Sequence, residues 1–233
     1  TGLIDGRLVV VSGADSPIPR PAYSAVGFTK GPYADELAVR RRIPLVRLLE
    51  PGGASIPVAR GTRGRPCYDL PAPSSPHQPC METMATVPVV CAALGPVAGF
   101  PAGRLVASQL SIMTRDTAQV LTGGPALVER ALGETTTKED LGGAKVHERS
   151  GVVDNVAEDE ADVWRQIRKF LSYLPPNVWE KPPVFDVGDL RSREEDELLE
   201  IIPRNRRQVY KIRRVIELII DRGSFFEMTP GYG

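Results

Sequence analysis

Two glycine-rich turns are the parts of this sequence best suited to chemistry. One reads PGGAS, residues 51–55, and the other GPVAGFPAG, residues 95–103; each follows an apolar run and precedes a stretch that can form a helix. Backbone N–H groups at a helix start have no partner within the helix and carry a positive partial charge. Such a turn can hold the oxygen of a carbonyl that becomes an enolate, with no catalytic side chain. Glycines that only permit a tight turn would give the same pattern.

Catalytic side chains have little support in the sequence. It contains two histidines, His77 and His147, and no HExxH, CxxC, GxSxG or Walker-type phosphate motif. The three cysteines, Cys67, Cys80 and Cys91, lack metal-ligand spacing, so we expect no metal site. Their odd number argues against a disulfide framework and favours a reducing, intracellular compartment. We interpret His147 as a structural residue.

An acidic run follows His147, in the segment AEDEADV, residues 157–163. Acidic residues in the first turn of a helix interact favourably with its dipole, and Asp154 or Asn155 can cap its start. After the run, apolar residues recur at helical spacing until prolines end the pattern. They are Trp164, Ile167, Leu171 and Leu174, followed by Pro175 and Pro176. We therefore interpret the run as the capped, solvated start of a helix that begins near Glu158.

Composition limits the class of protein. Of the 233 residues, 42% are hydrophobic and 25% are charged, which is enough apolar material for a packed core. Lysine plus arginine number 29, as do aspartate plus glutamate, so no basic excess points to nucleic acid or an anionic membrane surface. No apolar run reaches the roughly 20 residues of a membrane helix, and no signal-peptide pattern is present. Because the first residue is Thr1, close to an apolar run, we expect a piece of a longer chain or a processed one.

Three segments repeat one plan, in which an apolar run leads into glycines and then into a more helical stretch. The runs are residues 7–11, 43–49 and 87–94. Short β-branched runs bounded by glycine and proline predict strands that are buried on both faces. A further strand is predicted at residues 111–114. Strand, glycine turn, helix and strand, repeated in this way, indicate an α/β fold built from a recurring unit.

The remaining segments separate helices from linkers. GPYADELAVRRR, residues 31–42, predicts a helix with its proline near the first turn. Residues 57–79 form a proline-rich stretch without periodicity, and a loop of that length is often functional. Residues 175–193 have the composition of a linker. A second helix is predicted at residues 206–221, with Gly223 as its C-cap.

Five stretches occur in the order found in one enzyme family. They read PLVRLLEPGGAS (44–55), VPVVCAALGPVAGFPAG (87–103), TAQVL through EADV (117–163), RKFLSYLPPN (168–177) and YKIRRVIELIIDRGSFFE (210–227). The most specific is LGGAKVH, residues 141–147, followed by SGVVDNVAEDEA, residues 150–161. In these stretches the chain resembles the carboxyltransferase subunit of biotin-dependent acyl-CoA carboxylases, such as the propionyl-CoA carboxylase β subunit.

The resemblance implies a crotonase (ClpP/crotonase-like) fold of repeated ββα units stacked as a superhelix. Family subunits carry two domains of that fold and assemble into hexamers. Residues 1–180 are then expected to be the acyl-CoA-binding N-terminal domain without its earliest segment. Residues 181–233 are expected to be a linker and the entry into a C-terminal domain that is largely missing. On this reading the isolated chain binds acyl-CoA at best and does not carboxylate it.

The resemblance also implies the reaction. A carboxyl group moves from carboxybiotin to the α-carbon of a short-chain acyl-CoA such as propionyl-CoA or acetyl-CoA. Biotin is carried on a partner protein or domain, not on this chain, and the expected partners are a biotin carboxylase/biotin carboxyl carrier subunit and other carboxyltransferase subunits. The expected location is the cytoplasm, or the mitochondrial matrix in a eukaryote.

Backbone amides are the implied catalytic groups, which agrees with the scarcity of catalytic side chains. In the family, the thioester oxyanion is held at the turn that here reads VAGFPAG, so Gly99 and Phe100 are the candidates. Gly52, Gly53 and Ala54 of the other turn are secondary candidates. The amides that serve biotin are expected in the C-terminal domain.

Some positions depart from the family pattern. Many members have a second small residue where Phe100 stands and an arginine where Ser55 stands, and the loop GRPCYDLPAPSSPHQP, residues 64–79, has no counterpart. Two other readings therefore stay open: a biotin-dependent acyl-CoA decarboxylase, which runs the transfer backwards, and a non-catalytic subunit of such a complex. The apolar faces at 164–174 and 209–219, with the missing domain, predict a multimer or a larger complex.

Overall fold

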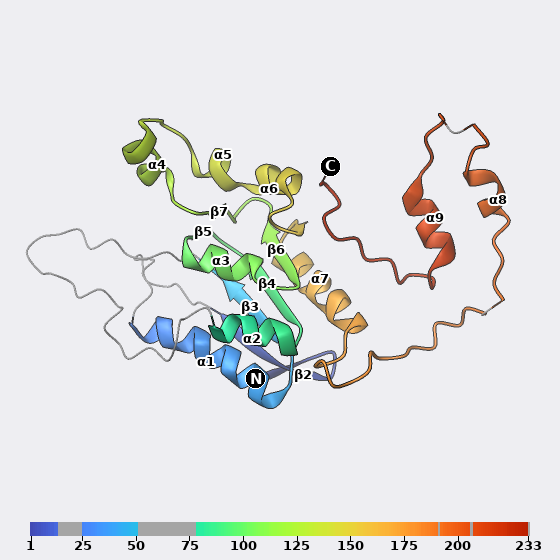
Figure 1. Ribbon diagram of the computed structural model, residues 1–233, viewed down its shortest axis with the longest axis horizontal. Coiled ribbons are helices and arrows are strands. Elements are labelled where there is room, and N and C mark those ends of the chain that lie inside the picture. Colours follow the sequence, from blue (N-terminus) through green and yellow to red (C-terminus); the bar gives the residue numbers. More distant parts are fainter. Residues whose placement is uncertain (14–24, 51–77, 191, 206, 233) are drawn as a thin grey trace, which may run out of the picture. The chain divides into compact units, whose positions relative to one another are not determined.

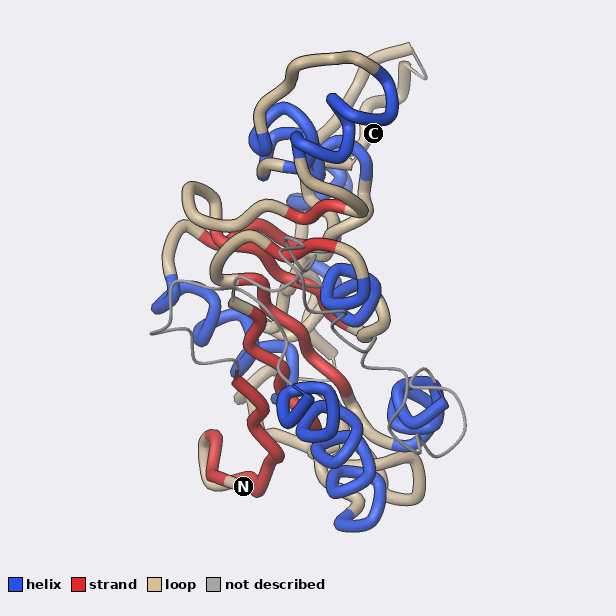
Figure 2. The backbone as a smooth tube through the Cα atoms, turned by 90° about the vertical axis from the view of Figure 1, so that its left-hand side faces the viewer, coloured by secondary structure: helices blue, strands red, loops and turns tan. Residues whose placement is uncertain are grey.

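The structure is a computed structural model and describes residues 1–13, 25–50, 78–190, 192–205 and 207–232. Its main feature is a six-stranded sheet with the order β1-β2-β3-β4-β6-β8 (Figure 1). The strands are β1 (Gly2–Ile4), β2 (Arg7–Gly13), β3 (Leu45–Leu49), β4 (Val89–Ala93), β6 (Leu110–Thr114) and β8 (Asn155–Ala157). β1 pairs antiparallel with β2 at the edge nearest the N-terminus (Figure 2), and the other neighbours are parallel.

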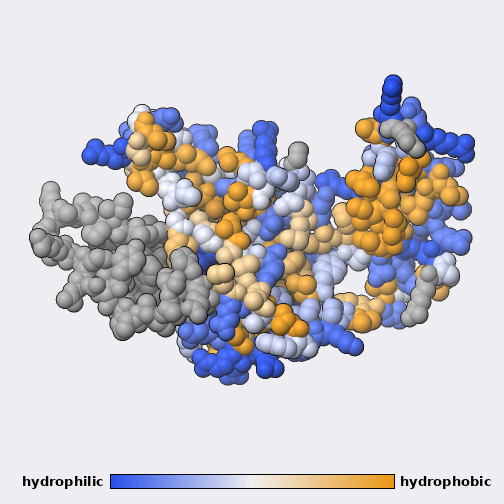
Figure 3. Space-filling model, viewed as in Figure 1, coloured by the Kyte–Doolittle hydropathy of each residue, from blue (hydrophilic) through white to orange (hydrophobic). Residues whose placement is uncertain are grey.

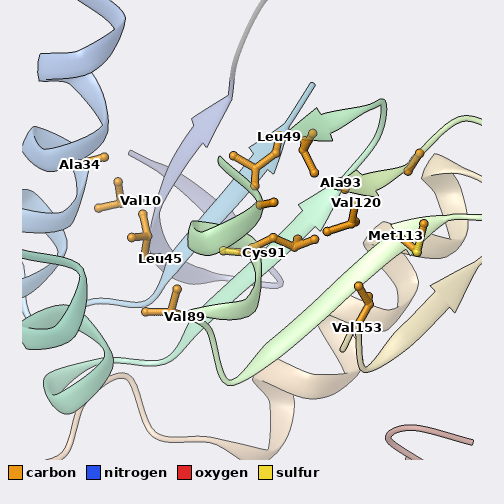
Figure 4. Close-up of a cluster of buried hydrophobic side chains, with 14 of the residues drawn as sticks. Val10, Ala34, Leu45, Leu49, Val89, Cys91, Ala93, Met113, Val120 and Val153 are labelled. Carbon is orange, nitrogen blue, oxygen red and sulfur yellow. The ribbon is translucent and has the colours of Figure 1, made fainter. Parts of the chain in front are cut away.

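Helices cover both faces of this sheet. α1 (Ala25–Arg41), α2 (Gln78–Thr86) and α3 (Phe100–Val106) connect successive parallel strands, and α7 (Glu160–Tyr173) follows β8. Ala34 of α1 belongs to one core cluster with Leu45 and Val89 (Figure 4). Leu105 of α3 belongs to the same cluster. Successive residues of a strand point to opposite faces, so the buried Val46 faces the other side, and α7 packs on that side against β6 and β8. The fully buried β4 and β6 are therefore covered from both faces, as parallel strands require.

A two-stranded sheet lies beside the large one. β5 (Val97–Ala98) pairs in parallel with β7 (Val120–Leu121). After β7 the chain forms three short helices, α4 (Pro125–Leu132), α5 (Lys138–Gly142) and α6 (Ala144–Ser150). In the described part of the chain, no helix is both long and apolar enough to cross a membrane.

The predicted strands are confirmed and share one sheet. Residues 7–11, 43–49, 87–94 and 111–114 correspond to β2, β3, β4 and β6. The α/β class is confirmed with them. The proline-rich loop at 57–79 lies almost wholly outside the described residues, although α2 already begins at Gln78.

Two predicted helix starts are wrong. α1 begins at Ala25, so Pro32 lies inside it; a proline there removes one backbone hydrogen bond without ending this helix. The N-cap of α7 is Asp159, whose carboxylate accepts a hydrogen bond from the Asp162 N–H at 2.7 Å. Asp154 and Asn155 cannot cap α7, because they lie at and before β8, where the backbone pairs with β6.

The apolar face of α7 is used within the chain, contrary to the prediction that it seeks a partner. Ile167 and Leu171 are buried, because they pack on the sheet. Trp164 and Leu174 are half-buried, so only the ends of this face stay partly accessible to a partner.

The chain divides into two compact units, Thr1–Pro182 with Met228–Gly233 and Pro183–Glu227. The second unit contains α8 (Glu197–Ile201) and α9 (Ile212–Ile219). α9 is shorter than predicted and is capped by Ile220; Gly223 is not its C-cap but adopts a positive φ of 71° in the next turn. The division at 180/181 into an acyl-CoA-binding domain and the entry to another carboxyltransferase domain stays a prediction.

The last described residues rejoin the first unit. The Thr229 N–H donates to the Asp154 carbonyl at 3.0 Å and to Asn155 Oδ1 at 3.1 Å. The Tyr232 ring lies against Gly151, where a Cβ would be 2.7 Å from the ring. Residues 183–227 therefore leave the first unit and return to it.

Candidate functional site

The strands that precede the two glycine-rich stretches end at the same edge of the sheet. β3 and β4 are parallel neighbours, so their carboxyl ends lie together, where open α/β sheets commonly bind ligands. The Leu94 N–H, just past β4, donates to the Leu49 carbonyl at 2.8 Å, just before the first turn. Residues 51–55, with the candidates Gly52, Gly53 and Ala54, lie outside the described residues.

The second turn is described, and it connects β5 to α3. Gly99 has φ 68° and ψ −127°, a combination that residues with a Cβ rarely adopt. α3 begins at the next residue, Phe100, whose side chain is half-buried. Pro101 in the first turn has no N–H to offer. The amides at this helix start that a ligand can use are therefore fewer than in a turn without proline.

The predicted contact of the Gly99 amide with a thioester oxygen stays a prediction, and the structure shows that this amide already has a partner within the protein. The Gly99 N–H donates to the Leu121 carbonyl at 3.0 Å, as an extension of the β5–β7 pairing. An amide that is already paired within the protein is not a preorganised donor for a substrate. Gly99 also has a conformational role, because its positive φ directs the chain from β5 into α3. The roles of Gly99 and Phe100 as donors to the thioester oxygen both stay predictions.

β7 is held in turn by the LGGAKVH segment. His147 is buried, and its Nε2 lies 2.9 Å from the Val120 carbonyl oxygen. Gly142 approaches the same carbonyl so closely that a Cβ there would collide with it. The interpretation of His147 as structural is confirmed, and its partner is the strand that pairs with the candidate turn.

A buried ionic cluster lies beneath α3. Asp35 of α1 binds Arg47 of β3 at 2.6 Å and Arg104 of α3 at 2.7 Å, and all three side chains are buried. Arg47 Nη1 also donates to the carbonyls of Arg104 at 3.4 Å and Ala107 at 3.1 Å, at the C-terminal end of α3. A cation in that position suits the helix dipole. The cluster therefore ties α3 to the helix and strand below it.

Sequence reasoning missed this cluster. Its one signal is Arg47 in PLVRLLE, a charged residue on the same strand face as Leu45 and Leu49, which face the core. Cys80 and Cys91 lie 3.4 and 3.5 Å from the same guanidinium. Burial raises the pKa of the Cys91 thiol, which keeps it protonated and unsuited to nucleophilic chemistry. Among the described residues, no group of histidine, cysteine and acidic side chains could hold a metal.

The parallel sheet, its crossover helices and the backbone turn at the strand ends define an α/β domain of the crotonase-like class. The family model described as "Carboxyl transferase domain" matches residues 1–233, so this chain belongs to the carboxyl transferase domain family. Both the predicted family and the predicted fold are confirmed.

Relatives and solved structures agree. The chain is 31% identical to methylmalonyl-CoA decarboxylase subunit alpha of Veillonella parvula over 99% of its length and 44% of the relative. It is 28% identical to the mitochondrial propionyl-CoA carboxylase beta chain of Homo sapiens over 99% of its length and 42% of the relative. Transcarboxylase 12S, solved with hydrolysed methylmalonyl-coenzyme A bound, matches with a TM-score of 0.85 at 26% identity, over 100% of this chain and 44% of that one. The chain thus spans less than half the length of these proteins.

Proposed function

We propose that this chain is the acyl-CoA-binding part of the carboxyltransferase in a biotin-dependent acyl-CoA carboxylase. The observation that carries the proposal is the family match across residues 1–233. The names of relatives support the substrate class, since they include propionyl-CoA carboxylase and 3-methylcrotonyl-coenzyme A carboxylase subunits. The proposed substrate is a short-chain acyl-CoA such as propionyl-CoA or acetyl-CoA.

In this proposal the chain orients the thioester and stabilises its enolate. The Phe100 N–H donates to the thioester oxygen, and the conformation of Gly99 aims it. Gly52, Gly53 and Ala54 are proposed as further donors from the neighbouring strand end. Biotin on a carrier supplies the carboxyl group and accepts the α-proton, and no residue of this chain is assigned to hold it. Donors fixed before the reaction cost no reorganisation when charge develops on the oxygen.

Partners follow from the same chemistry. The proposed assembly contains a biotin carboxylase/biotin carboxyl carrier subunit and further carboxyltransferase subunits. Transcarboxylase 12S, a structural relative, is described as a hexamer, which supports a multimer here. The proposed location is the cytoplasm, or the mitochondrial matrix in a eukaryote.

The test uses the native assembly, purified through a tag on this chain. With ATP, labelled bicarbonate and propionyl-CoA or acetyl-CoA, we expect acid-stable label in the acyl-CoA product and its loss when avidin blocks biotin. Acyl-CoA binding is measured separately by calorimetry. An assembly that neither binds acyl-CoA nor transfers a carboxyl group would contradict the proposal and favour the non-catalytic subunit.

Decarboxylation is the second candidate. It is favoured by two relatives named methylmalonyl-CoA decarboxylase subunit alpha, at 31% and 30% identity. This reading predicts carbon dioxide release from methylmalonyl-CoA without ATP, and co-purification of a membrane sodium-pump partner. A co-purified ATP-dependent biotin carboxylase would favour the carboxylase instead.

A further inference from the structure

The candidate turn depends on β7 for its position. Val97 and Gly99, on either side of Ala98, donate their N–H groups to the Gln119 carbonyl at 2.7 Å and the Leu121 carbonyl at 3.0 Å. Within the described residues, β5 is the strand with which β7 pairs, so neither belongs to the six-stranded ladder. A strand of two residues contributes little order of its own. Something else must fix β7.

The LGGAKVH segment makes that connection on the opposite edge of β7. Alternate carbonyls of a strand point to opposite sides, so the Val120 carbonyl faces away from β5 while its neighbours bind β5. His147 Nε2 meets this carbonyl at 2.9 Å, and because a carbonyl only accepts, Nε2 carries the proton. The bond is buried, so losing the donor would leave a buried acceptor unsatisfied.

Two further contacts hold α5 against β7 and the residue before it. Gly142 lies against the Val120 carbonyl and the Leu121 side chain, where a Cβ would collide with both. Glu139 of α5 accepts a hydrogen bond from the side-chain amide of the buried Gln119, which directly precedes β7. The glycines and the histidine thus act together, because glycine permits the close approach that brings His147 within reach.

We propose that His147 is a positioning residue for the β5–α3 turn, acting through the Val120 carbonyl and the Leu121–Gly99 hydrogen bond. The inference rests on the proposed function, in which the Phe100 amide stabilises the thioester enolate. The turn must hold its geometry most closely when charge develops on the oxygen, so the loss should fall on kcat more than on the KM for acyl-CoA.

The experiment compares His147→Leu with His147→Gln in the native assembly. Leucine removes the donor, and we expect kcat to fall roughly 10-fold while the KM for propionyl-CoA stays within about 2-fold. The glutamine side-chain amide can donate from nearly the position of Nε2, so His147→Gln should recover most of kcat. Hydrogen exchange of residues 95–106, read by mass spectrometry, should be faster in His147→Leu and near normal in His147→Gln.

Arg149→Ala is the matched control. Arg149 is exposed on the same helix, α6, so neither kcat nor exchange should change. Gly142→Ala tests the link independently of the histidine and should speed exchange at the turn and lower kcat. Gly124→Ala, where nothing lies within 4 Å of an added Cβ, should do neither.

Two results would overturn the inference. One is a folded His147→Leu assembly, or a folded Gly142→Ala assembly, with normal kcat and normal exchange at the turn. The other is an equal loss in His147→Gln and His147→Leu, since the hydrogen bond would then not be the cause. An unmutated assembly without carboxyl transfer would defeat the proposed function, and the exchange data would then decide the link between His147 and the turn.

Discussion

The two units of the chain bury their residues very differently. In the first unit, β4 and β6 are buried along their whole length, and even the charges of Asp35 and Arg47 are only 1% and 2% exposed. In the second, α9 buries Val215 and Leu218 but leaves much of its apolar surface in solvent, and Figure 3 shows apolar residues gathered there. Ion pairs such as Arg214–Glu197 at 2.5 Å lie on the surface of the second unit.

This difference in burial indicates which unit depends on one fixed packing arrangement for its stability and function. A buried charge is tolerated only with its partner, so the first unit is sensitive to single changes. Exposed ion pairs are weak and screened by salt, so the second unit tolerates their loss. The candidate turn belongs to the first unit, where geometry is held from below by the ionic cluster and from the side by β7.

The largest expected effect is on the ionic cluster. Asp35→Ala leaves Arg47 and Arg104 buried without their carboxylate, which should lower the free energy of unfolding by about 3–5 kcal/mol. Urea unfolding followed by fluorescence measures this. The control is Glu158→Ala, which removes an exposed carboxylate from Arg115. Equal midpoints for the two variants would mean that the cluster contributes no more than a surface pair.

Gly99→Pro tests whether the geometry of the β5–α3 turn matters for turnover in a first unit that still folds. Proline removes the N–H that binds the Leu121 carbonyl and fixes φ near −65°, far from the observed 68°. We expect a roughly 100- to 1000-fold loss of carboxyl transfer in the native assembly, comparable to losing an oxyanion donor. Turnover and circular dichroism are measured together. Phe100→Ala keeps its amide and should cost far less, unless the ring shapes the acyl pocket; near-normal turnover of folded Gly99→Pro would rule out this turn.

A smaller effect on stability is expected in the second unit. Ile212 and Ile219 are 54% and 65% exposed on α9, so changing both to serine removes apolar surface with little change in the free energy of unfolding. Because exposed apolar surface favours association, the same change should shift the predicted multimer toward smaller species by light scattering. The outcome that counts against this is an unchanged mass at micromolar concentration.

The smallest effect concerns Arg214 and Glu197. A hydrogen bond from Arg214 lowers the pKa of Glu197 below its ordinary value of 4.5. A carboxyl whose folded pKa is lowered contributes stability above its unfolded pKa, and that contribution disappears as pH falls through the folded value. Glu197→Gln should therefore lower the urea midpoint slightly at pH 7. It should leave the midpoint unchanged at a pH below the folded pKa of Glu197, where the carboxyl is protonated. High salt should remove even the small difference.

Sequence patterns predict the first unit better than the second, and for physical reasons. β-branched runs bounded by glycine and proline mark β3, β4 and β6, because a strand buried on both faces has no polar alternation. The N-cap of α7 was misplaced because β8 uses the residues that look like caps. α9 is shorter than its periodicity indicates, since a helix with so little packing gains little from extra turns.

The candidate site was only partly predictable. The turn at Gly99 is visible in the sequence, but the occupation of its amide is not, because its acceptor Leu121 comes from a separate strand. Arg47 gave a weak signal as a charge among apolar residues, whereas Asp35 and Arg104 gave none. LGGAKVH identified the family. The contact of its histidine with the Val120 carbonyl could not be predicted, because only the folded chain brings the two residues together.

Because Met228 and Thr229 belong to the first unit, residues 183–227 form an insertion whose two ends are both attached to that unit. The entropy of closing such a loop rises only slowly with its length, by about 0.6 kcal/mol for each doubling. Residues could therefore be added to or removed from this insertion with little loss in the stability of the sheet. A single proteolytic cut inside it would leave both fragments attached, because each still holds one anchor on the first unit.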